Sequence, residues 1–122
     1  MNTKRLYGIR GAWCTENNVD SICNDVENMI TGILDKNNLQ EDDIVSVQFS
    51  ITDDLDVLNP CAALRIRNLC QNTALFCTQE AYTNGYLPKT IRVLITAYLA
   101  VPPIHVYGGG AEILRPGFAN RG

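Results

Sequence analysis

The side chains with the most specific chemistry in this sequence are four arginines, Arg10, Arg65, Arg92 and Arg115, together with Glu80. An arginine binds a carboxylate through two parallel hydrogen bonds and stays charged at any relevant pH. Each of the four is predicted at the end of an element or on a short helix, and together they exceed what one glutamate can neutralise. Taken singly, each is more often a solvated surface charge than a ligand. If they converge, their ligand is a small dianion or dicarboxylate.

Arg92 raises the question most directly, because it stands in a stretch, TNGYLPKTIRVLITAYLAV over residues 83–101, that otherwise predicts a buried strand. A charge taken out of water costs several kcal/mol unless it meets an anion. Within the chain that anion can be Glu80, and the pair then only stabilises the fold. A ligand carboxylate is the alternative, and spacing alone does not decide between the two.

Other reactive side chains show no catalytic or metal-binding pattern. The five cysteines are irregularly spaced without a C-x-x-C pair, so reduced and mostly buried thiols are expected; they are Cys14, Cys23, Cys61, Cys70 and Cys77. The single histidine, His105, lies among apolar residues and is predicted to be structural rather than a general base. We expect no metal site and no cofactor.

Composition predicts one globular domain over residues 1–122 with a loose tail at about 116–122, because 46% of the residues are hydrophobic and 19% are charged. The net charge is −3 and the basic residues are scattered, which does not favour nucleic acid. The sequence MNTKRLYGIRGAW lacks the apolar segment of a signal peptide. The longest apolar run, residues 93–104, is too short to span a bilayer. We therefore expect no membrane partner and a cytoplasmic location.

The first half of the chain predicts strand, helix and strand. Residues 4–10 predict a strand that ends at Arg10, between Gly8 and Gly11. Asn17 or Asn18 then caps a helix that ends near residues 36–38. Its apolar stripe is Val19, Ile22, Cys23, Val26, Met29, Ile30, Ile33 and Leu34. Apolar and polar residues alternate over 45–51, which predicts a strand with one buried face.

The second half predicts a short helix and several strands. Asn59 is the expected N-cap and Pro60 the first residue of a helix over 60–69. Strands are predicted over 74–79 and 90–100, and a final pair over 104–107 and 111–114 is divided by the GGG sequence. The pattern predicts an α+β fold, a mixed β-sheet with helices packed on one face. The other face carries Leu94 and Tyr98 beside Arg92. Exposing such an apolar face to water is unfavourable, so we expect it to be buried in an oligomer.

Five blocks of the sequence, in order, resemble the AroH-class (Bacillus-type) chorismate mutases: YGIRGAWCTENN, SITDDLDVLNPCAALR, LFCTQE, KTIRVLI and HVYGGGAEILRP. The resemblance extends from about residue 5 to 117. It implies a homotrimer whose sheets form a trimeric pseudo-α/β-barrel, with active sites between subunits. It also implies the Claisen rearrangement of chorismate to prephenate in phenylalanine and tyrosine biosynthesis. Chorismate carries two carboxylates, and the rearrangement requires no nucleophile, metal or cofactor.

The resemblance also implies roles for individual residues. Arg92 would donate to the ether oxygen of chorismate, and Arg10 with Tyr107 would bind the side-chain carboxylate. Glu80 would be ionised and meet the ring hydroxyl. The other implied substrate-binding residues are Cys77 at that hydroxyl, Leu75 and Phe76 along the pocket, Asn59, Cys61, Ala62 and Arg65 across the subunit boundary, and Leu114 and Arg115 in a C-terminal segment over the site.

The chain departs from the family pattern at several positions. Asn59 replaces an aromatic residue, and Ala62 replaces a lysine, which removes a cation near the ring carboxylate. GGG at 108–110 replaces bulkier, charged residues and is expected to loosen the last hairpin. Trp13 and Cys14 stand where small hydroxyl residues are typical.

Two other functions stay open. The YjgF/RidA-type imine deaminases are trimers of similar shape that bind small carboxylates with an arginine, although their motifs do not match CTQE or LRP here. A noncatalytic trimer that binds a small carboxylate is the other alternative, if Asn59 and Ala62 have removed turnover.

Overall fold

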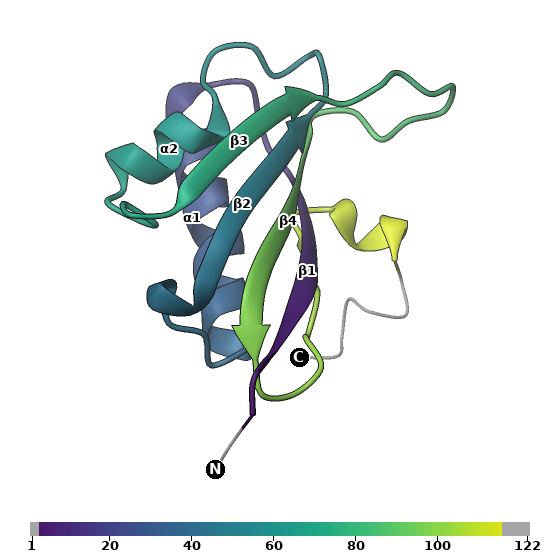
Figure 1. Ribbon diagram of the computed structural model, residues 1–122. Coiled ribbons are helices and arrows are strands. Elements are labelled where there is room, and N and C mark those ends of the chain that lie inside the picture. The colour runs from purple at the N-terminus through teal and green to yellow at the C-terminus, as the bar shows by residue number, and fades with distance from the viewer. Residues whose placement is uncertain (1–2, 116–122) are drawn as a thin grey trace.

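A five-stranded mixed sheet with two helices on one face forms the domain, as the computed structural model shows (Figure 1). The structure describes residues 3–115, so the predicted tail at 116–122 lies outside the described residues. The elements are β1 (Arg5–Cys14), α1 (Val19–Lys36), the 3-10 helix η1 (Glu41–Asp43), β2 (Ile44–Ile51), α2 (Pro60–Ile66), β3 (Ala74–Gln79), β4 (Thr90–Leu99), β5 (Val106–Gly108) and the 3-10 helix η2 (Ala111–Leu114).

The strands lie in the order β3-β2-β4-β1-β5, with β4 at the centre. β4 is antiparallel to both β1 and β2, whereas β2 with β3 and β1 with β5 form parallel pairs. The predicted α+β class with a mixed sheet is therefore confirmed. Because β1, β4 and β5 are neighbours in the sheet, segments from near the start and near the end of the chain lie side by side.

Helix α1 covers the sheet through the predicted stripe. Asn18 is the N-cap, and its Oδ1 accepts a hydrogen bond of 2.8 Å from the Ser21 N–H, which satisfies a free donor of the first turn. The stripe from Ile22 to Ile33 is buried, but Val19 is 47% exposed, so its predicted place in the core is wrong. Val19 is the first helical residue and lies beyond the edge of the packed face. Neither helix within residues 3–115 has the length and hydropathy needed to cross a membrane.

Helix α2 begins as predicted and ends earlier. The Asn59 side chain accepts from the Cys61 N–H at 2.8 Å, and Pro60 fills the first helical position. The helix stops at Ile66 rather than at 69, because Asn68 adopts a left-handed backbone with φ of 58°. A hydrogen bond from the Leu69 N–H to the Leu64 carbonyl then closes the end.

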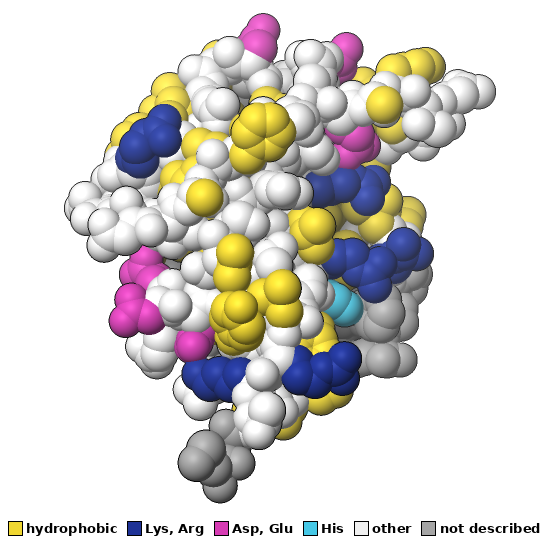
Figure 2. Space-filling view, viewed as in Figure 1, with side chains coloured by type: hydrophobic (Ala, Val, Ile, Leu, Met, Phe, Trp, Pro, Cys, Tyr) yellow, Lys and Arg dark blue, Asp and Glu magenta, His cyan; other side chains and the backbone are white. Residues whose placement is uncertain are grey.

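The two faces of β4 differ as its alternation predicts. Ile91, Val93, Ile95, Ala97 and Leu99 are buried under the helices. On the other face Leu94 is 41% and Tyr98 46% exposed, and the edge strand β3, beyond β2, adds Phe76 at 60%. Figure 2 views this open face, with hydrophobic side chains over the strands and basic side chains along its right-hand side. Neither α1 nor α2 covers it (Figure 1).

The predicted last strand pair is wrong in its second half. Only residues 106–108 form a strand, and it pairs in parallel with β1 rather than with a hairpin partner. Gly109 and Gly110 have φ of 59° and 98°, and these left-handed residues turn the chain into η2. The start of η2 is held by Ala111, which is fully buried against Ala12 and Tyr107.

Strand β1 is longer than predicted, and this changes the place of Arg10. Pairing with β4 continues from Arg5 opposite Leu99 to Cys14 opposite Thr90. Arg10 therefore lies in the middle of a strand, opposite Leu94, and not at its end. Local composition around Gly11 suggested an end, but the cross-strand hydrogen bonds with β4 carry the strand onward.

Candidate active site

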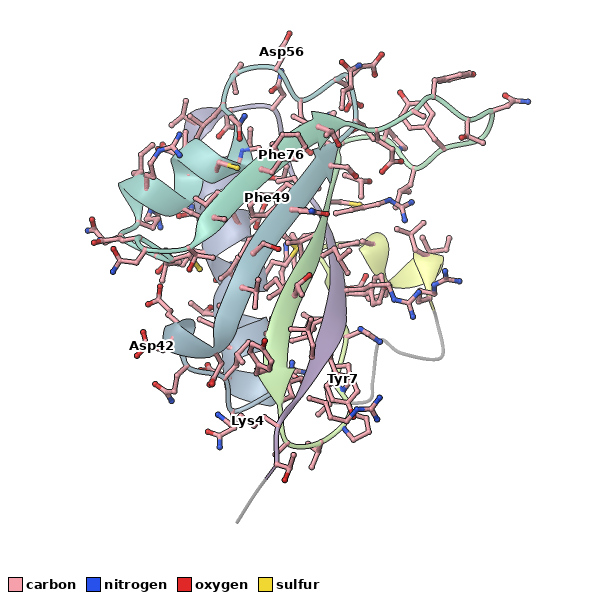
Figure 3. The ribbon with its side chains drawn as sticks, in the orientation of Figure 1. Lys4, Tyr7, Asp42, Phe49, Asp56 and Phe76 are labelled. Carbon is pink, nitrogen blue, oxygen red and sulfur yellow. The ribbon has the colours of Figure 1, made fainter. Side chains whose placement is uncertain are left out.

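A cavity of about 370 Å³ lies on the open face of the sheet. Arg10, Arg92 and Tyr107 line it from β1, β4 and β5, and Phe76 forms its far wall on β3. The remaining lining residues are Gly11, Ala12, Gln48, Phe49, Ser50, Thr78, Val93 and Leu94. Phe49 and Phe76 come from the neighbouring strands β2 and β3 (Figure 3). The cavity thus combines two cations with apolar walls, as a site for a small organic anion requires.

Strand register brings the polar groups together. Arg92 on β4 and Tyr107 on β5 are both paired with Ala12 of the strand between them. Residues paired in this way point to the same face of a sheet. The small side chain of Ala12, which is only 1% exposed, leaves the room above it to the two larger ones. Arg10 precedes Ala12 by two residues and so shares that face.

Arg92 pairs with Glu80, as one of the two predicted interpretations requires. Its Nε lies 2.8 Å from Glu80 Oε1, although within residues 3–115 no acceptor lies in the direction of that N–H. The contact is therefore an ion pair by distance rather than a well-directed hydrogen bond. The Ser50 hydroxyl also donates to Glu80 Oε1 at 3.3 Å. The Arg92 side chain is still 42% exposed, so the guanidinium can also face a ligand in the cavity.

Arg10 is held through its backbone by the histidine. Its N–H donates to His105 Nδ1 at 2.9 Å, so Nδ1 is unprotonated and a neutral ring carries its proton on Nε2. Burial of the ring, followed by the charge of Arg10, lowers the pKa of His105. In Figure 2 the histidine lies beside basic side chains. His105 has the structural role that its apolar context suggested, and that role concerns a residue of the cavity.

Several of the other expected site residues lie on the opposite side of β3. Leu75 and Cys77 pack against the hydrophobic core, while Phe76 and Thr78 between and after them face the cavity. Asn59 and Cys77 line a second cavity of about 230 Å³, and Cys61, Ala62 and Arg65 follow on α2. Burial, with a smaller contribution from Cys61, raises the pKa of the Cys77 thiol to about 11. Within one chain, Cys77 and Arg92 therefore do not share a cavity.

The C-terminal residues lie nearer the first cavity. Leu114 packs against the cluster of Ala12, Tyr107 and Ala111. Arg115 is exposed, and its backbone N–H donates to the Glu112 carbonyl at 3.2 Å. The ends of η2 and β5 thus lie beside Tyr107, whereas the Arg115 side chain makes no contribution to the cavity lining.

Eight lining residues were not among the predicted site residues: Gly11, Ala12, Gln48, Phe49, Ser50, Thr78, Val93 and Leu94. The alternation of residues 45–51 placed Gln48 and Ser50 on the open face, which was an available signal. Their position opposite Leu94 and Arg92 depends on the register of β2 against β4, which no local pattern contains.

The fold and the site define a class, an α+β domain that presents an arginine-lined cavity for a small anion on the open face of its sheet. A family model described as chorismate mutase type I matches residues 6–118. The chorismate mutase AroH of Bacillus subtilis (strain 168) is 33% identical over 115 residues, which are 91% of each chain. A solved chorismate mutase from Clostridium thermocellum superposes with a TM-score of 0.79 at 34% identity, over 88% of this chain and 98% of that one.

The chain belongs to the chorismate mutase type I family. The expectation of a chorismate mutase enzyme, drawn from the five sequence blocks, is confirmed.

Proposed function

We propose that the cavity on the open face binds chorismate and converts it to prephenate in a homotrimer. The observation that supports this most is the convergence of Arg10, Arg92 and Tyr107 on one cavity. Chorismate brings two carboxylates and an ether oxygen to such a site, and the apolar wall of Phe76 suits its ring. Prephenate leaves by the same opening.

The rearrangement needs positioning and charge rather than proton transfer. In one cyclic movement of electron pairs, the ether C–O bond breaks while a new C–C bond forms, so every atom stays in the molecule. The protein must hold the compact conformer in which the two ends meet. It must also place positive charge at the ether oxygen, where negative charge develops.

Arg92 supplies that charge in this proposal, and Glu80 orients it. The ion pair at 2.8 Å fixes one edge of the guanidinium, and the exposed part is left for the substrate. Glu80, ionised beside Arg92, also accepts from the ring hydroxyl. Arg10 and Tyr107 bind the side-chain carboxylate, with the Arg10 backbone anchored by His105. Preorganised donors of this kind contribute about 3–4 kcal/mol each to the barrier reduction.

The neighbouring subunit would supply the remaining wall. Cys77, the N-cap Asn59 and the α2 residues Cys61, Ala62 and Arg65 lie across β3 from the Arg92 cavity, so one chain does not complete the site. β3 is an edge strand, and the open face beside it is apolar at Leu94 and Tyr98. Packing the open faces of three chains together would bury these residues and place one chain's α2 against the next chain's Arg92. A cytoplasmic location is part of the same proposal.

A first experiment tests the reaction. Loss of chorismate absorbance is followed for the wild type and for Arg92→Ala, with prephenate identified by acid conversion to phenylpyruvate. We expect rapid conversion by the wild type and a loss of at least about 10²–10³ in rate for the variant. Binding of chorismate without conversion would support the noncatalytic alternative. Deamination of a 2-imino acid, with chorismate untouched, would support the imine deaminase.

A second experiment tests the shared site. Arg92→Ala and Arg65→Ala chains are mixed in equal amounts, unfolded together and refolded, beside each variant treated alone. If the two arginines of one site come from different chains, every mixed trimer contains one intact site, and about a quarter of the wild-type activity returns. If both come from the same chain, no intact site forms and the mixture stays as inactive as its components. Light scattering of the wild type gives the oligomeric state independently.

A further inference from the structure

Two departures from the family pattern, Trp13 and the glycines at 108–110, meet in the structure. Trp13 on β1 is paired with Gly108 on β5, and Ala12 is paired with Tyr107. Because side chains alternate along a strand, Trp13 points to the helix-covered face while Tyr107 points to the cavity. Trp13 packs there against the hydrophobic core.

The indole occupies the space that side chains at 108 and 109 would need. A Cβ added to Gly108 would lie 2.3–2.6 Å from three atoms of the six-membered ring. A Cβ added to Gly109 would lie 2.5 Å from Cδ1 and Nε1 of the same indole. Both distances are far below van der Waals contact, so the bare glycine backbone rests on the face of the ring. The indole of Trp13 therefore fits only because residues 108 and 109 have no side chains.

This contact restrains a segment that has few other restraints. β5 is three residues long, and it is followed by two glycines, the amino acid with the greatest backbone freedom. Trp13 is partly buried, and its indole provides a large, rigid apolar surface at low entropic cost. Tyr107 comes directly before the glycines, and η2 with Leu114 comes directly after them. The positions of Tyr107 and of η2 beside the cavity therefore depend on the conformation of residues 108–110.

We propose that Trp13 is a positioning residue for Tyr107: by supporting the Gly108–Gly110 backbone from the covered face, it fixes the tyrosine that binds substrate on the open face. The proposal rests on the proposed function, since it assigns the binding role of Tyr107 to a tightly held β5. It also changes the interpretation of the glycines. They do not loosen the end of the chain, because the indole fills the volume that their side chains leave.

The test is a double-variant cycle on chorismate turnover. Trp13→Ala is expected to raise KM roughly three- to tenfold, the effect of one weakened hydrogen bond, with a smaller change in kcat. Tyr107→Phe raises KM as well, and Trp13→Ala added to Tyr107→Phe should raise it no further, because the tryptophan acts through the hydroxyl. Leu39→Ala is the matched control, since Leu39 is 5% exposed in the core and lines no described cavity; it should lower stability and leave KM unchanged.

A complementary pair tests the packing itself. Gly108 has no positive φ, so a larger side chain is compatible with its backbone once the indole is gone. Trp13→Ala combined with Gly108→Leu should recover part of the lost affinity, whereas Gly108→Leu alone should be strongly destabilised. If Trp13→Ala does not fold, Trp13→Phe replaces it, and the fluorescence of the wild type gives a second measurement. Trp13 is the single tryptophan, and its emission should change when prephenate binds and change less in Tyr107→Phe.

Additive KM effects of Trp13→Ala and Tyr107→Phe, or an emission that prephenate leaves unchanged, would overturn the positioning role while the proposed reaction stands. A wild-type protein that does not convert chorismate would overturn the proposed function first, and the two failures are thereby distinguished.

Discussion

Arg92 on β4 and Tyr107 on β5 lie on opposite sides of Ala12, which is on the strand between them, β1, and is paired with both. The two large polar side chains can meet over a single ligand because the residue between them is one methyl group. Ala12 is only 1% exposed and also contacts Ala111 of η2. The smallness of this residue is therefore a condition for the shape of the cavity.

Ala12→Val should reduce substrate binding as well as stability. The added methyl groups project between Arg92 and Tyr107, so we expect KM to rise about tenfold and the free energy of unfolding to fall by about 1–3 kcal/mol through overpacking. Ala97→Val is the control, because Ala97 is fully buried on the covered face of β4. It should lose similar stability with KM unchanged. Equal KM values in both variants would show that Ala12 does not shape the binding site.

His105 makes stability depend on pH with a predictable sign. Its pKa is lowered in the folded protein, by burial first and by Arg10 second, below the ordinary value of 6.5. The unfolded chain therefore binds more protons near and below that value. The contribution of neutral His105 is complete above pH 6.5 and is lost as the pH falls through the folded-state pKa. Protonation also places a hydrogen on Nδ1 and removes the acceptor for the Arg10 N–H.

Two variants of His105 separate its charge from its hydrogen bond. In His105→Asn the Oδ1 atom can replace Nδ1 as acceptor without titrating, so urea unfolding should lose this component of the pH dependence and retain most of the stability at pH 8. His105→Ala should lose about 1 kcal/mol at pH 8, because the Arg10 N–H loses its partner. A histidine-to-asparagine variant as pH-dependent as the wild type would assign the acid sensitivity to other groups.

Ala62→Lys should restore the cation that this chain lacks. Ala62 is half-buried on α2, which the proposed trimer places against the neighbouring cavity. A partly exposed lysine contributes up to about 1 kcal/mol to an anion, so KM for chorismate should fall roughly fivefold with kcat little changed. Ile66→Lys adds the same charge to the same helix at a residue that is 55% exposed, and it should not improve binding. Equal improvement in both would indicate general charge attraction rather than a specific contact.

The two helix caps allow a comparison of structure with binding. Asn18 and Asn59 each accept a backbone hydrogen bond of 2.8 Å at the start of a helix. Replacing either by alanine should lower the free energy of unfolding by about 1 kcal/mol. Only Asn59→Ala should also raise KM, because the start of α2 forms part of the proposed inter-subunit wall. An unchanged KM in both variants would restrict Asn59 to its capping role.

Local patterns in the sequence predicted most of the elements. The alternation of β4 separates its buried face from its open face, and Asn18, Asn59 and Pro60 mark helix starts as expected. These predictions succeed because capping and periodicity act over a few neighbouring residues. The end of β1 and the nature of residues 111–114 were predicted wrongly. Both depend on partners far along the chain, namely β4 for the former and Ala12 with Tyr107 for the latter.

The sequence by itself determined the chemistry available to this protein: arginines for a small anion, a single glutamate to pair with Arg92, and five blocks typical of one enzyme family. The tertiary structure decided which of these residues share a cavity. Strand order and register bring Arg10, Arg92 and Tyr107 onto one face. They also place Cys77 and Glu80, three residues apart, with the core and with Arg92 respectively. Alternation fixes the face that a side chain takes, but cross-strand hydrogen bonds between distant segments fix its neighbours.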